Sequence, residues 1–118
     1  MIQEFGNWLK YEKRYSVHTI TSYLNDLNQF GLFLTEYYPE TIPERADASM
    51  IKSWIVYLMD QKFSATTVNR KIVSLNSFFK YLQKEGRIEQ NPVIHIKGPK
   101  KSKRLVKYLE EEEILVVL

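Results

Sequence analysis

The hydrophobic residues of this chain recur at intervals of three and four positions, the spacing of amphipathic helices. Four stretches show this pattern, at about residues 2–13, 17–37, 47–61 and 65–85. The stripe of the last stretch consists of Val68, Ile72, Leu75, Phe79 and Leu82. Strand patterns are weak throughout, so the sequence predicts an all-α fold with a four-helix bundle as the default architecture.

Capping and helix-breaking residues mark the ends of these predicted helices. Residues that favour the N-cap position precede three of them: Ser16, Asp47 and Ser64. Two prolines predict a loop at residues 38–46, and Gly86 stands where a left-handed C-cap is favoured. The segment 87–96 that follows predicts irregular structure with one turn after Asn91.

Composition narrows the classes of function. The chain has 118 residues and 44% hydrophobic residues, which indicates a single domain with a real core. It has no cysteine, no apolar run of about 20 residues and no phosphate-binding glycine loop. Its two histidines, His18 and His95, are not in metal-ligand spacing. We therefore expect no metal, no cofactor, no membrane contact, no small-molecule substrate and no active site in this chain.

The aromatic residues fit the core better than a base-stacking platform, because most of them lie on the apolar stripes. They are Trp8, Phe30, Phe33, Trp54, Phe78 and Phe79.

Charge is distributed unevenly. The net charge is −3 over residues 1–61, +10 over residues 62–107 and −4 over residues 108–118. A block of +10 can attract a polyanion such as nucleic acid. Basic surfaces also occur on proteins that bind no nucleic acid, so charge alone leaves both interpretations open.

The polar faces of two predicted helices have a composition that suits a DNA groove. Projection of the fourth helix at 100° per residue places six residues opposite its apolar stripe: Thr66, Arg70, Val73, Ser77, Tyr81 and Lys84. Asn69 and Lys71 fall on the shoulders of that face. The second helix exposes His18, Ser22, Asn25 and Gln29. Hydroxyl, amide and guanidinium groups can contact base edges and phosphates, although any solvated helix has a polar outer face.

Two blocks of the sequence stand out: "SVHTITSYLNDLNQFGLFL", residues 16–34, and "SATTVNRKIVSLNSFFKYLQKEGRIEQNPVIHIKGPK", residues 64–100. The first resembles the pattern S-x-x-T-x-x-x-Y-x-x-D-L-x-x-F-x-x-F of the N-terminal core-binding domain of tyrosine recombinases of the phage-integrase and Xer type. The second is similar to the same domain's last long helix and the basic linker after it.

The resemblance implies a four-helix, SAM-like orthogonal bundle with a basic C-terminal linker, forming half of a C-shaped clamp on recombination-site DNA. The second and fourth helices would enter the major groove. The DNA-facing residues that the resemblance implies on them are Ser16, His18, Thr19, Ser22, Thr66, Thr67, Asn69, Arg70 and Lys71. Those implied in the linker, along the phosphate backbone, are Lys97, Lys100, Lys101, Lys103 and Arg104.

The resemblance also implies a domain organisation. Residues 1–96 would be the core-binding domain, 97–108 a basic interdomain linker and 109–118 the start of an otherwise missing catalytic domain. Neither histidine begins the family's His-x-x-Arg motif, and no tyrosine can be named as the nucleophile. We therefore expect no strand cleavage by this chain.

The implied partners are double-stranded recombination-site DNA and other recombinase protomers, which the first helix often contacts in this family. The implied location is the bacterial cytoplasm, at the nucleoid. The alternative, from a different class, is a helical protein–protein interaction domain whose basic stretch is only a linker.

Overall fold

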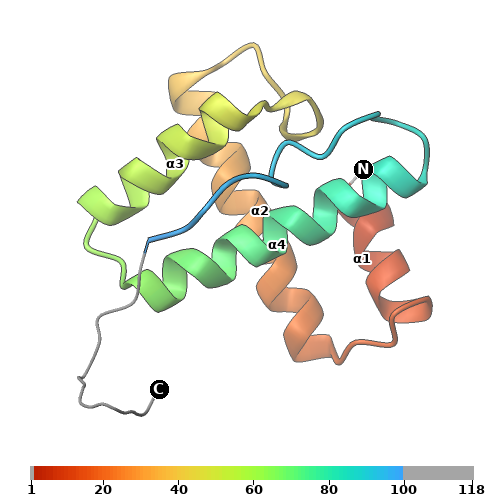
Figure 1. The fold of residues 1–118 in the computed structure, drawn as a ribbon. Coiled ribbons are helices and arrows are strands. Elements are labelled where there is room, and N and C mark those ends of the chain that lie inside the picture. Colours follow the sequence, from red (N-terminus) through yellow and green to blue (C-terminus); the bar gives the residue numbers. More distant parts are fainter. Residues whose placement is uncertain (1, 100–118) are drawn as a thin grey trace.

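Within the part of the chain that the structure describes, the fold consists of four α-helices and one short 3-10 helix (Figure 1). The computed structural model describes residues 2–99, and no strand occurs in that range. The elements are α1 (Ile2–Tyr11), α2 (Val17–Tyr37), η1 (Pro43–Arg45), α3 (Ala48–Asp60) and α4 (Ala65–Lys84). Helices α2 and α4 cross near the centre of the view, and the all-α prediction is confirmed.

The N-caps are those that the sequence predicted. The hydroxyl of Ser16 accepts from the backbone N–H of Thr19 at 3.2 Å, and that of Ser64 accepts from Thr67 at 3.2 Å. The carboxylate of Asp47 caps α3. Each cap satisfies one of the helix N–H groups that has no partner within the helix.

Residues with left-handed backbone follow the C-terminal ends of α1 and α4. Helix α1 was expected to run to about residue 13 but stops at Tyr11, because Arg14 adopts a left-handed φ of 58° and turns the chain away. The predicted left-handed C-cap after α4 is confirmed, since Gly86 has a φ of 75°.

The core draws on all four helices. Phe5 of α1 packs edge-on against Phe78 of α4 at 5.4 Å between ring centroids, and Phe30 of α2 lies 5.0 Å from Trp54 of α3. Of the six aromatic residues assigned to packing, five are buried and Trp8 is half-buried, so that prediction is confirmed. Burial of each large apolar side chain contributes about 1.5–3 kcal/mol before conformational entropy is counted.

Tyr81 corrects the helical projection, which placed it on the outer face of α4. Its side chain is buried, because α1 covers this turn and brings Phe5 and Trp8 to 5.6 and 5.2 Å from its ring. Burial, with the nearby Glu85 and Glu4 carboxylates, raises the pKa of the Tyr81 hydroxyl above its usual value. The outer face of α4 is therefore narrower at its C-terminal end than the sequence alone suggested.

The chain after α4 turns back along the bundle (Figure 1). The predicted turn after Asn91 is present: the Asn91 side chain accepts from the N–H of Val93 at 2.9 Å, and the Asn91 carbonyl accepts from the N–H of Ile94 at 3.2 Å. Val93 is buried and Ile96 packs against the core, so this irregular segment is anchored to the bundle.

Candidate nucleic-acid interface

Helices α2 and α4 begin with the same hydroxyl arrangement. In each, the cap serine donates its proton to the hydroxyl of the threonine three residues later, at 3.0 Å from Ser16 to Thr19 and 3.0 Å from Ser64 to Thr67. The threonine hydroxyl then keeps its own proton for an outside acceptor. Neither first turn carries an acidic residue. The positive end of each helix dipole is therefore not neutralised by a carboxylate at the cap.

A basic residue with left-handed backbone stands two positions before each of these serines. Arg14 has a φ of 58° and Lys62 a φ of 72°, and both are exposed. Non-glycine residues seldom adopt this conformation, so glycine would be the expected choice for backbone reasons alone. Neither residue was among the sequence-based candidates. The signal was present, since "RYSVHT" and "KFSATT" share the order basic, aromatic, Ser, x, x, Thr.

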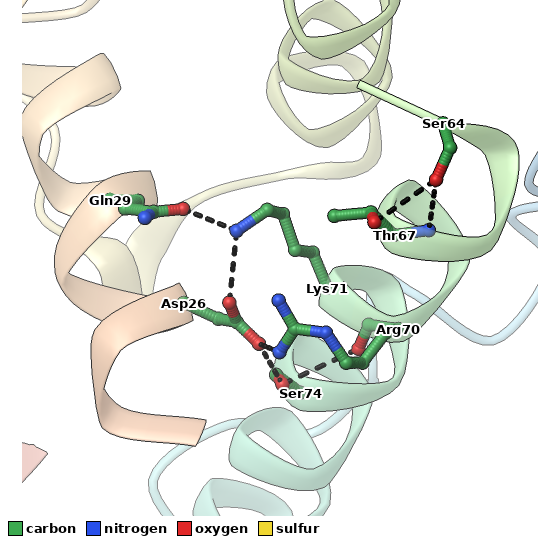
Figure 2. Close-up of polar contacts among 7 residues, drawn as sticks. All are labelled: Asp26, Gln29, Ser64, Thr67, Arg70, Lys71 and Ser74. Atoms are coloured by element: carbon green, nitrogen blue, oxygen red, sulfur yellow. Dashed lines mark hydrogen bonds and ion pairs between the residues drawn. The ribbon is translucent and has the colours of Figure 1, made fainter. Parts of the chain in front are cut away.

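A buried carboxylate joins the two helices (Figure 2). Asp26 of α2 accepts from the guanidinium of Arg70 at 2.6 Å, the ammonium of Lys71 at 3.0 Å and the hydroxyl of Ser74 at 2.6 Å. Lys71 also donates to the side-chain oxygen of Gln29. We call these five residues the Asp26 network. Because two cations share one carboxylate, the network has a net charge of +1.

The two cations of the Asp26 network differ in exposure. The side chain of Arg70 is 47% exposed, whereas that of Lys71 is 3% exposed. Both were candidates for contact with DNA. Lys71 lies inside the bundle with its ammonium satisfied by Asp26 and Gln29 (Figure 2). Arg70 has one guanidinium nitrogen on Asp26, and nearly half of its side chain is exposed.

The end of the described chain is held at the start of α4. The side-chain amide of Asn69 donates to the carbonyl of Pro99 at 2.9 Å. A Cβ at Gly98 would lie 1.8 Å from Oδ1 of Asn69, so any other residue there would force the Asn69 side chain to move. We call this contact of Asn69 with residues 98–99 the linker latch. It gives half-buried Asn69 a partner within the chain and brings exposed Lys97 to the first turns of α4.

The other sequence-based candidates fall into three groups. Exposed ones gather at the starts of α2 and α4: Ser16, His18, Ser22 and Thr66. Thr19 and Thr67 are half-buried within the cap arrangements described above. Four lie outside the described residues: Lys100, Lys101, Lys103 and Arg104. The proposed boundaries at residues 97–108 and 109–118 fall largely outside them as well.

Within residues 2–99, no cluster of three or more His, Asp or Glu side chains could hold a metal ion. None of the helices in that range is long and apolar enough to cross a membrane.

Comparison with known proteins gives consistent matches. The family model described as phage integrase, N-terminal SAM-like domain, matches residues 2–86. The tyrosine recombinase XerC of Rickettsia conorii is 30% identical over 122 aligned residues, and that of Rickettsia bellii is 33% identical over 122. Each alignment covers 100% of this chain and 40% of the relative, so the chain spans less than half the length of these curated relatives.

A solved structure shares the fold. The integrase from mycobacterium phage Brujita superposes with a TM-score of 0.73 at 22% sequence identity. The match covers 91% of this chain and 34% of that one. It confirms the SAM-like bundle that the sequence resemblance implied.

Proposed function

Because the chain belongs to the family of phage integrase N-terminal SAM-like domains, we propose that it binds duplex DNA through the starts of α2 and α4. In this proposal both helix starts face the major groove, and the domain forms half of a clamp on a recombination site. The observation that carries it is the matched pair of serine-capped helix starts, each with an exposed basic residue and no carboxylate.

Each of the two helix starts offers several favourable groups to a polyanion. Free backbone N–H groups, the positive end of the helix dipole and threonine hydroxyls all favour phosphate oxygens. Arg14 and Lys62 add exposed positive charge beside them, and Arg70 adds a guanidinium that can contact phosphate or a guanine edge. Helix α3 provides the contrast, because its cap is the carboxylate of Asp47.

The proposal extends to the protein of which such a domain is part. We infer a tyrosine recombinase whose strand cleavage and rejoining are carried out outside this chain, acting on recombination core-site DNA with other protomers in the cytoplasm. In this arrangement Lys97 and the basic residues after it would follow the phosphate backbone between the two domains.

Binding to a short mixed-sequence duplex, measured by fluorescence anisotropy, tests the proposal. Affinity should fall as salt rises from about 50 to 200 mM, because phosphate contacts release counterions. R70A should weaken binding by about 1–3 kcal/mol. K52A is the matched control: it also removes one positive charge, but from an exposed position on α3. Equal losses from both variants would remove Arg70 from the interface.

A second candidate is a protein-interaction domain, favoured by the apolar surface between α2 and α3. Leu32 is 70% exposed there, beside a groove of about 320 Å³ that Phe33, Trp54 and Tyr57 help to line. Absence of DNA binding at low salt and micromolar protein would favour this candidate. Retention of DNA binding in a Leu32→Ser variant would show that this surface is not needed for DNA.

A further inference from the structure

We infer that Asp26 is a positioning residue for Arg70: its buried carboxylate fixes the guanidinium so that its free donors face the DNA. This inference rests on the proposed function and adds to it a residue that itself makes no contact with DNA. Asp26 is almost fully buried, with a side chain 2% exposed, so it cannot reach a ligand outside the bundle.

The carboxylate of Asp26 is itself held from both sides. Its Oδ1 accepts from Lys71 at 3.0 Å, and its Oδ2 accepts from Ser74 at 2.6 Å as well as from Arg70. With both oxygens bound, the carboxylate has one orientation, and the nitrogen of Arg70 that it binds is fixed with it.

Arg70 is not needed to neutralise the buried charge. Lys71 alone balances Asp26, and both lie inside the bundle, so the pair is neutral without a third ion. Arg70 is therefore an additional cation, and it is the exposed one. Within residues 2–99 no second hydrogen bond holds its guanidinium, which leaves the other N–H donors available.

A held guanidinium binds more tightly than a free one, because the side chain has already lost its rotamer freedom. Immobilising one long side chain on binding costs enough to weaken affinity by about two- to tenfold. Because Asp26 already holds the Arg70 side chain in the free protein, little of that cost remains when DNA binds. In the rival explanation Arg70 only adds to the stability of the bundle, and its orientation is irrelevant to binding.

Charge-balanced variants separate the two explanations. D26N/K71M removes one buried charge of each sign, so the net charge of the chain is unchanged and neither buried ion loses its partner. It leaves Arg70 in place, held at most by a neutral amide oxygen, which is a weaker acceptor than the carboxylate. K71M alone is the matched control, because the Asp26 carboxylate remains to hold Arg70. Circular dichroism and urea unfolding would establish that each variant is folded.

Affinity for the mixed-sequence duplex is measured for the unmodified chain, K71M and D26N/K71M, and again for each of these with R70A added. We expect D26N/K71M to weaken binding about three- to tenfold when Arg70 is present, and by less than about twofold in the R70A background. The duplex affinity of K71M should be closer to that of the unmodified chain than the affinity of D26N/K71M is. In the free protein, the side-chain Nε–H of Arg70 should show restricted NMR motion that D26N/K71M releases.

Other outcomes overturn the inference in distinguishable ways. Equal losses in both backgrounds would mean that Asp26 acts through the fold and not through Arg70. Full affinity in D26N/K71M would mean that the orientation of Arg70 does not matter. In both of those cases DNA binding by the unmodified chain would still stand. Failure of the unmodified chain to bind any duplex would instead overturn the proposed function, and this inference with it.

Discussion

The ammonium of Lys71 lies 3.0 Å from the carboxylate of Asp26, with both side chains almost completely buried between α2 and α4. Such a pair is stable only while both partners are present, because an isolated buried charge is costly. Gln29 and Ser74 supply further hydrogen bonds to the two ions.

Removal of Asp26 should therefore cost more than removal of Lys71. In D26A the Lys71 ammonium loses its only anionic partner and keeps the hydrogen bond to Gln29 and the contact with the Phe63 ring. We expect a loss of about 3–5 kcal/mol in the free energy of unfolding. In K71M the Asp26 carboxylate still has Arg70 and Ser74, so the loss should be smaller. Urea unfolding measures both. An equal or larger loss in K71M would contradict this description of the pair.

The cap residues allow charge to be changed without loss of the cap. Aspartate caps a helix about as well as serine, so S16D and S64D should leave the free energy of unfolding nearly unchanged. Each places a carboxylate at a proposed phosphate contact and should weaken duplex binding by about 1 kcal/mol or more at low salt. D47S, the reverse change on α3, is the control and should leave DNA affinity nearly unaffected. Similar DNA affinities for S64D and D47S would count against the proposed interface.

Lys62 should show opposite effects on stability and binding. Its φ of 72° is strained for a lysine, so K62G should raise the free energy of unfolding by up to about 1 kcal/mol. The same change removes a positive charge beside the start of α4 and should weaken DNA binding. G86A is the reference for the cost of left-handed backbone at a residue other than glycine. It should lower the free energy of unfolding, because Gly86 also has a positive φ. An added Cβ there meets no other atom, so the loss would report the backbone conformation alone. A K62G variant that loses stability would show that the left-handed conformation carries no strain.

The linker latch predicts coupling between two residues that are far apart in sequence. A Cβ at Gly98 collides with the side chain of Asn69, so G98A should break the hydrogen bond from Asn69 to Pro99. The side-chain amide signal of Asn69 and hydrogen exchange at residues 96–98 would report the loss. N69A breaks the same hydrogen bond, so G98A should have little further effect in an N69A background. Additive effects of the two changes would mean that they act separately.

Much of the fold was predictable because its signals are local. The helix stripes, the serine and aspartate caps and the left-handed Gly86 each depend on residues within about one or two turns, and the structure has them where the sequence placed them. Tyr81 was assigned to the wrong side, because a projection of α4 alone contains no information on where α1 packs.

The candidate site was less predictable, because its contacts are distant in sequence. Asp26 lies 44 residues from Arg70, and Asn69 lies 30 residues from Pro99. A helical projection places Lys71 at the edge of the polar face, and only the position of Asp26 explains why it turns inward. A clue was available at Asp26 itself, an acidic residue beside Leu27 and one turn before Phe30, both of them in the core.

An NMR titration of the isotopically labelled chain with duplex DNA tests the central claim most directly. We predict that backbone amide shifts concentrate at residues 14–22, 62–70 and 97, at the starts of α2 and α4. The exposed face of α3 around Ser49, Lys52 and Val56 should remain unchanged. Shifts centred on α3 or on the groove between α2 and α3, or no shifts at low salt, would contradict the claim that these two helix starts bind DNA.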